Sequence, residues 1–193
     1  IYLNAILDQL SLSKHNVYVM GVSTGCVLQA KFLELYASRI TASLMVTPLF
    51  LTGKRSQLNA QALIDMGGQV DEKSREEYLD LIYFDYFSDE YLENREKTVS
   101  FMRNNVRKLL LENTSMSKSL AAILKACLNF GMGFDQWAEQ FAGMQIPTRV
   151  VASKMDRLVQ SEDLAIAADW MSADFHQVHN SGHLLFVERQ DYF

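Results

Sequence analysis

The chain of 193 residues is long enough for one domain, and its 18 basic and 23 acidic residues give a net charge of −5. A content of 49% hydrophobic and 21% charged residues excludes a disordered segment, and 2 prolines with 9 glycines exclude a collagen-like chain. The acidic balance argues against a nucleic-acid partner. Apolar runs are far shorter than the roughly 18 residues that a membrane span needs, so we expect no membrane span.

Two cysteines, Cys26 and Cys127, are too few for a disulfide framework or a zinc site. Both fall in apolar helical patterns, which predicts reduced side chains buried in a core. The cysteine usage therefore predicts a reducing compartment, and we expect a cytoplasmic protein without a bound metal ion.

The first part of the chain alternates between helical and strand patterns. Residues 1–12 have the apolar spacing of an amphipathic helix, and residues 17–20 form a short continuous apolar run. Such a run predicts a strand buried on both faces of a parallel sheet. A tight turn at 21–25 leads into helical spacing over 26–37, and residues 44–46 predict a second buried strand.

Helical patterns then dominate residues 54–141. A strand pattern returns at 149–152, a helix begins at Ser161, a last strand covers 175–178 and a last helix covers 184–193. Short apolar strands that alternate with helices predict an α/β fold with a mostly parallel sheet flanked by helices.

The long helical stretch divides the chain. It is too long for a plain connection between two strands, which predicts an insertion over one edge or face of the sheet. We therefore expect residues 1–53 and 142–193 to form the core and residues 54–141 to form a helical cap.

One motif in the chain carries chemistry. The segment Gly21-Val22-Ser23-Thr24-Gly25 has the pattern G-x-S-x-G between a buried strand and a helix. A sharp turn there presents the Ser23 hydroxyl above the sheet as a nucleophile, and the helix N-terminus offers the Thr24 N–H to an oxyanion. The alternative is a plain strand-to-helix turn in which Ser23 caps the helix.

This motif and two later segments resemble the serine-dependent α/β-hydrolase family. Residues 146–159 resemble its penultimate strand and acid-bearing loop, and residues 181–193 resemble its histidine loop and closing helix. The resemblance implies a truncated α/β-hydrolase fold and a triad in the chain order Ser23, Asp156, His183. His183 would act as the base, and Asp156 would orient the imidazole.

Each partner of the serine has a rival. His179 shares its loop with His183, but Gly182 favours His183 because it lets the loop fold back toward the serine. Asp163 is a rival for Asp156, although its place in the first turn of a helix is typical of a charge that stabilises the helix dipole.

The resemblance also implies a part of the family's sheet that should precede the nucleophile. Only 22 residues stand before Ser23, and they hold no loop that could give a second oxyanion N–H. We therefore expect a C-terminal part of a hydrolase, completed by an N-terminal segment or a partner chain. Two copies can also pair at a sheet edge left open at residue 17, which makes an oligomer a second expectation.

Aromatic residues of the cap are candidates for a substrate pocket. Tyr83, Phe87, Trp137 and Phe141 could line an apolar acyl or alcohol site above Ser23. The alternative is ordinary packing between helices. An apolar pocket would suit a substrate of modest size.

Together these residues predict a serine hydrolase that cleaves an ester, thioester or lactone of a modest apolar substrate through an acyl-enzyme. The expected partner is this small molecule, and no metal or organic cofactor is implied. One alternative is a non-catalytic relative that only binds a ligand. Another is acyl transfer or perhydrolysis by the same triad.

Overall fold

The structure is a computed structural model and describes residues 2–12, 17–67, 72–112 and 114–192. Ile1 and Phe193, which belong to the predicted terminal helices, lie outside the described residues. The strands are β1 (Tyr18–Val22), β2 (Ala42–Val46), β3 (Thr148–Ser153) and β4 (Asp174–Val178). The helices are α1 (Tyr2–Gln9), α2 (Thr24–Tyr36), α3 (Lys54–Gly67), α4 (Glu72–Tyr86), α5 (Asp89–Asn94), α6 (Glu96–Glu112), α7 (Thr114–Met132), α8 (Phe134–Gly143), α9 (Ser161–Trp170) and α10 (Leu185–Glu188), with short 3-10 helices η1 (Ala37–Arg39) and η2 (Gln190–Tyr192).

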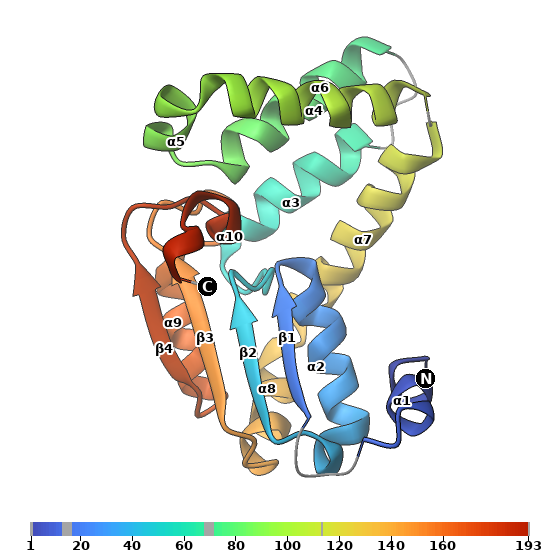
Figure 1. Cartoon of the computed structure of the whole chain (residues 1–193), viewed down its shortest axis with the longest axis vertical. Coiled ribbons are helices and arrows are strands. Elements are labelled where there is room, and N and C mark those ends of the chain that lie inside the picture. Colours follow the sequence, from blue (N-terminus) through green and yellow to red (C-terminus); the bar gives the residue numbers. More distant parts are fainter. Residues whose placement is uncertain (1, 13–16, 68–71, 113, 193) are drawn as a thin grey trace.

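The four strands form one parallel sheet in the order β1-β2-β3-β4. Neighbouring parallel strands that follow one another in the chain are joined by right-handed crossovers, which put the connecting helices on one face. Figure 1 shows α2, α8 and α9 on that face, behind the strands. The predicted α/β class with a parallel sheet is therefore confirmed.

The main core lies between the sheet and these helices. Met45 and Val150 point into it from the strands, and Leu33 and Leu164 meet them from α2 and α9. All four side chains are buried, so the sheet is held to its helices by apolar contact.

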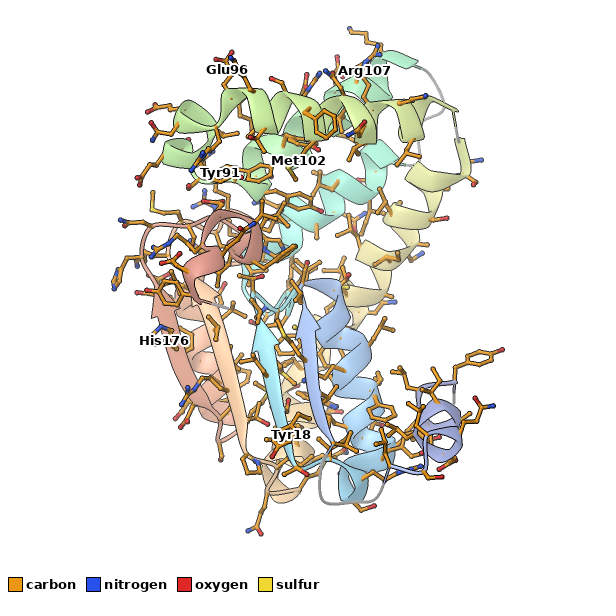
Figure 2. All side chains as sticks on the ribbon, viewed as in Figure 1. Tyr18, Tyr91, Glu96, Met102, Arg107 and His176 are labelled. Atoms are coloured by element: carbon orange, nitrogen blue, oxygen red, sulfur yellow. The ribbon has the colours of Figure 1, made fainter. Side chains whose placement is uncertain are left out.

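The opposite face of the sheet differs from the prediction at β1. Tyr18 is 71% exposed and Met20 is 51% exposed, and Figure 2 shows Tyr18 near the lower end of the sheet. Successive side chains of a strand alternate between faces, and β1 packs against α2 through one of them. The prediction of a strand buried on both faces is therefore wrong for β1.

Helices α4, α5 and α6 lie above the carboxyl ends of the strands (Figure 1), and α3 packs against α7 below them. Ion pairs join α4 to α6: Arg103 pairs with Asp80 and Glu76, and Arg107 pairs with Glu76. The expected cap boundary at residue 141 falls inside α8, which packs against α9 behind the sheet. The division into core and cap stays a prediction.

Within the described ranges, every helix is too short or too polar to cross a membrane.

Candidate active site

Ser23 occupies a tight turn between β1 and α2. Its φ of 53° lies in the left-handed region that non-glycine residues rarely adopt. The backbone of Ser23 is fixed to the end of β2 and to the segment after it: Ser23 N–H donates to Val46 O at 3.0 Å, and Leu49 N–H donates to Ser23 O at 3.2 Å. These bonds hold the strained turn in one conformation.

Gly21 permits the close approach that this turn needs. A Cβ at Gly21 would lie 2.9 Å from the backbone of Cys26 and 2.2 Å from Gln29 Oε1. Because glycine has no side chain, α2 can begin directly against the end of β1. The first N–H groups of a helix have no partners within it, and α2 begins at Thr24, directly after Ser23.

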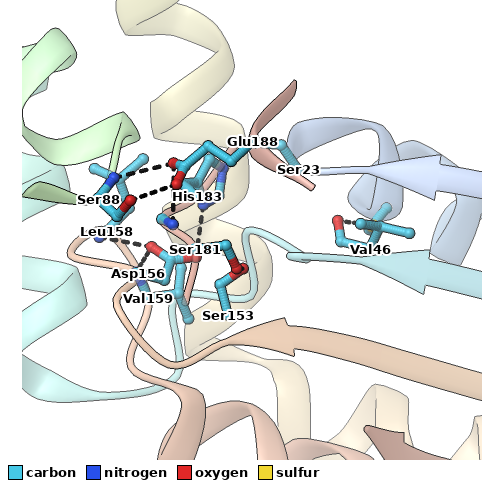
Figure 3. A network of polar contacts seen from close by, with 12 residues as sticks. Ser23, Val46, Ser88, Ser153, Asp156, Leu158, Val159, Ser181, His183 and Glu188 are labelled. Carbon is cyan, nitrogen blue, oxygen red and sulfur yellow. Dashed lines mark hydrogen bonds and ion pairs between the residues drawn. The ribbon is translucent and has the colours of Figure 1, made fainter. Parts of the chain in front are cut away.

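The Ser23 hydroxyl is the first member of a chain of two hydrogen bonds (Figure 3). Ser23 Oγ lies 2.7 Å from His183 Nε2, and His183 Nδ1 lies 2.7 Å from Asp156 Oδ2. His183 is only 1% exposed and Asp156 only 7% exposed. The three side chains come from the ends of β1, β3 and β4, which meet at one edge of a parallel sheet.

The loop after β3 fixes the Asp156 carboxylate. Its Oδ1 accepts the N–H of Leu158 at 2.9 Å and the N–H of Val159 at 3.1 Å. An ionised carboxylate only accepts hydrogen bonds, so a bond of His183 to ionised Asp156 requires the proton on His183 Nδ1. This tautomer leaves Nε2 free to accept the proton of the serine hydroxyl.

The acid loop and the histidine loop are also joined beneath this chain of bonds. Ser153 Oγ and Ser181 Oγ lie 2.9 Å apart, and Met155 N–H donates to Ser181 O at 3.1 Å. Both serines are fully buried. Buried hydroxyls that satisfy one another fix the spacing of the two loops.

This geometry can be compared with known structures. The chain superposes on the α/β hydrolase MGS-M2 from a Medee basin deep-sea metagenome library with a TM-score of 0.82 at 13% identity, covering 100% of this chain and 66% of that one. For a thermophilic esterase from Thermogutta terrifontis the TM-score is 0.69 at 15% identity, with 98% and 65% covered. For an enol-lactonase from Burkholderia xenovorans LB400 it is 0.66 at 14% identity, with 100% and 67% covered. The chain has the α/β-hydrolase fold.

The chain spans about two thirds of the length of these α/β-hydrolase structures. No protein-family model matches it, and no curated protein matches its sequence. The similarity at this low identity is therefore one of fold.

Within the α/β-hydrolase fold, the two sequence rivals lie apart from this chain of bonds. His179 is exposed after β4. Asp163 lies in the first turn of α9, where its carboxylate packs against Gly53. The structure therefore brings together the three side chains that the sequence singled out, and Thr24 follows Ser23 as the first residue of α2.

The four aromatic pocket candidates divide into two pairs. Tyr83 and Phe87 are buried in and just after α4, with ring centroids 5.8 Å apart. Trp137 packs on Phe141 at 5.0 Å within α8. Phe141 borders a hollow beside Pro147, at the amino end of β3, so this pair lies away from the serine.

A residue that the sequence reasoning did not single out covers the histidine. The ring of Tyr86 stacks on His183, with centroids 5.5 Å apart and planes 23° apart. Burial, with the nearby charges of Asp156 and Asp85, raises the pKa of Tyr86 to about 12. Its phenol therefore stays neutral and can donate a hydrogen bond. Tyr86 was one aromatic residue among many in its helix, so no local signal could have found it.

Proposed function

We propose that the protein is a serine hydrolase of the α/β-hydrolase fold that cleaves an ester, thioester or lactone. Ser23 attacks the carbonyl carbon, and His183 takes the hydroxyl proton and returns it to the leaving group. Asp156 holds the imidazole in the required tautomer and stabilises its protonated form. Water then attacks the carbonyl carbon of the acyl-enzyme, and His183 passes the proton of the water to the Ser23 oxygen as the free acid leaves.

One observation carries this proposal: the two 2.7 Å bonds that join the serine, histidine and aspartate side chains. Burial of the histidine and the aspartate supports the proposal further, because taking polar side chains out of water costs free energy unless hydrogen bonds compensate for it. The strained serine at a strand-to-helix turn is a further support. The alternative of a simple capping serine is disfavoured, since the Ser23 side chain makes no capping bond.

The oxyanion would bind at the N-terminus of α2. The Thr24 N–H belongs to the first residue of that helix, where N–H groups lack helical partners and the helix dipole is positive. Removing one such donor from an oxyanion site typically costs about 10²–10³-fold in rate. We assign this role to the Thr24 backbone.

The substrate class follows from the same site. A thermophilic esterase and an enol-lactonase are among the similar structures, which supports an ester or lactone substrate. Tyr86 stands over the histidine, and its buried neighbours Tyr83 and Phe87 remain candidates for an apolar wall. These features support a modest apolar acyl or alcohol group.

A fluorophosphonate probe tests the proposal, because it reacts with a serine only when a base activates it. The intact protein should be labelled at Ser23, and Ser23→Ala should abolish the labelling. Ser38→Ala, at an exposed serine after α2, is the matched control and should label normally. Labelling that persists in Ser23→Ala would identify another nucleophile.

Product analysis then separates hydrolysis from the related reactions. Release of free acid supports hydrolysis, whereas transfer of the acyl group to an added alcohol or peroxide would indicate an acyltransferase or a perhydrolase. An unlabelled protein that still binds acyl ligands would indicate a non-catalytic member of the fold.

A further inference from the structure

A short stretch of the helical cap contacts both loops that carry the proposed acid and base. We call residues 84–89, from the end of α4 to the start of α5, the brace. The brace lies about 70 to 100 residues from its partners along the chain, so its contacts are entirely tertiary.

The first set of contacts reaches the histidine loop. Leu184 N–H, directly after His183, donates to Tyr86 O at 3.0 Å. The Tyr86 ring also stacks on the imidazole. The brace therefore fixes the backbone beside the histidine and one face of its ring.

Glu188 of α10 joins the same loop to the brace a second time (Figure 3). Its Oε1 accepts the N–H of Gly182 and the N–H of Ser88, each at 3.0 Å, and its Oε2 accepts the Ser88 hydroxyl. One carboxylate thus binds Gly182, the residue before His183, and Ser88, the N-cap residue of α5. Hydrogen bonds to an ionised group are about twice as strong as neutral ones.

The histidine loop and the brace are in close contact at Gly182. A Cβ on Gly182 would lie 2.6 Å from the backbone of both Phe87 and Ser88. The histidine loop and the brace therefore touch backbone to backbone.

The second set of contacts reaches the acid loop. Arg157 follows Asp156 directly, and it donates to Phe84 O at 3.1 Å and to both carboxylate oxygens of Asp89 at 2.7 and 2.8 Å. Its partners stand at the two ends of the brace. The guanidinium therefore fixes the acid loop against the whole length of the segment.

We propose that Glu188 and Arg157 are positioning residues, which hold His183 and Asp156 in register through the brace of the cap. This inference rests on the proposed function, since it gives the histidine and the aspartate their roles. The cap then does more than cover the site, because it sets the geometry of the base. A misplacement of about 1 Å at such a site can cost about 100-fold in rate.

The sizes of the two effects should differ. Glu188 makes three charge-assisted bonds, two of them to backbone groups at the histidine loop and the brace. The Arg157 side chain is 39% exposed and pairs with an exposed carboxylate, and such pairs contribute little. The direct link between Ser153 and Ser181 remains in every variant, so neither change should remove activity altogether.

The test compares Glu188→Ala with Glu188→Gln. Gln keeps one carbonyl oxygen that can accept both backbone N–H groups, whereas Ala removes all three bonds. We expect Glu188→Ala to lower kcat for a small aryl ester by about 10-fold or more, with KM changed less than about twofold, and Glu188→Gln to recover most of the loss. Arg157→Ala should lower kcat by about 2- to 5-fold.

A spectroscopic readout needs no turnover. The proton on His183 Nδ1, held by a carboxylate, should give a proton NMR signal far downfield. Glu188→Ala should weaken or shift this signal, and Glu188→Gln should preserve it. Asp191→Asn, three residues further along the chain in an exposed ion pair, is the matched control and should leave both readouts unchanged.

The outcomes separate this inference from the proposed function. If Glu188→Ala keeps the signal and kcat and changes only KM or thermal stability, the brace merely attaches the cap and the inference is wrong. If the wild-type protein neither reacts with the probe nor turns over, the proposed function fails, and the signal alone decides the inference. If Glu188→Ala does not fold, Arg157→Ala decides it, and an unchanged signal and rate there would overturn it.

Discussion

Two sets of polar side chains, one at each end of the sheet, differ in their exposure to solvent. At the carboxyl end, Ser153, Ser181 and His183 are almost fully buried, and each has a hydrogen-bond partner. At the amino end, Arg149 and Asp174 form a pair with side chains 61% and 75% exposed. A buried polar group without a partner costs about 1–3 kcal/mol, whereas an exposed one costs nothing.

The difference has a structural consequence. Because Ser153, Ser181 and His183 each need a partner at one distance and angle, the loops that carry them are restricted to few arrangements. The exposed pair of Arg149 and Asp174 carries no such restriction. Changes to these buried groups should therefore alter chemistry and packing, and changes to the exposed pair should alter neither.

The largest effect is expected from removing a side chain that takes part in the hydrogen bonds between Ser23, His183 and Asp156. Ser23→Ala and His183→Ala should each lower esterase activity by at least about 10³-fold, because each removes the proton transfer that activates the nucleophile. The double variant should lose no more than the worse single variant. Steady-state rates on a small aryl ester measure this, and losses that multiply would argue against one shared step.

The two glycines of the G-x-S-x-G motif offer a matched pair at the same end. A Cβ on Gly21 would meet the Cys26 backbone at 2.9 Å, whereas a Cβ on Gly25 would meet nothing within 4 Å. We expect Gly21→Ala to lose about 1–3 kcal/mol of unfolding free energy through overpacking. Gly25→Ala should leave the unfolding free energy unchanged or raise it by up to about 1 kcal/mol, which is the difference in helix propensity between glycine and alanine.

Urea unfolding of both variants measures this difference, and the rate of probe labelling shows whether the turn has moved. Equal losses in the two variants would mean that the turn, rather than the contact with α2, demands glycine at both positions.

The sequence was informative about this end because its signals are local. A glycine-flanked serine between a strand and a helix, an aspartate after a strand and a histidine after the last strand each lie in one short segment. The structure places those three side chains in hydrogen-bond contact. The contact of Glu188 with Ser88 spans 100 residues, so no local pattern could predict it.

The one-sided burial of β1 shows a second limit. The apolar run at residues 17–20 predicted a strand covered on both faces, yet Tyr18 and Met20 are exposed. Hydrophobicity reports which side chains can be buried, and the packing of the helices decides which of them are. The last helix is a similar case: residues 184–193 were expected to continue as one helix, but α10 covers only Leu185–Glu188 before η2.

A smaller effect is expected from Asp85 in the brace. Burial raises the pKa of Asp85 above its ordinary value; the charge of Arg157 opposes this shift and that of Asp156 adds to it. The folded state therefore holds the Asp85 proton more tightly than the unfolded state. The resulting stabilisation is full below the ordinary pKa of 3.8 and is lost as the pH rises through the folded-state pKa.

Asp85→Asn should accordingly raise the unfolding temperature at pH 7, by no more than about 2 °C because the side chain is only half-buried. The gain should vanish below about pH 4. Glu139→Gln, at an exposed position on α8, is the control and should show no such trend. A variant that is less stable than wild type at pH 7 would contradict the assigned sign.

The smallest effect is expected at the amino end of the sheet. Arg149 and Asp174 pair at 3.3 Å across the starts of β3 and β4, next to an open hollow that Tyr18 and Met20 also border. An exposed pair gains little in water because the solvent already screens both charges, and ordering two side chains costs entropy. Arg149→Gln should therefore change the unfolding free energy by less than about 0.5 kcal/mol and leave kcat and KM unaltered. Arg149 lies in β3 and Arg157 in the loop after it, so Arg149→Gln and Arg157→Ala compare one arginine at each end of the sheet. A loss of activity in Arg149→Gln as large as that in Arg157→Ala would remove the distinction between the two ends, since both arginines would then act only by holding the sheet together.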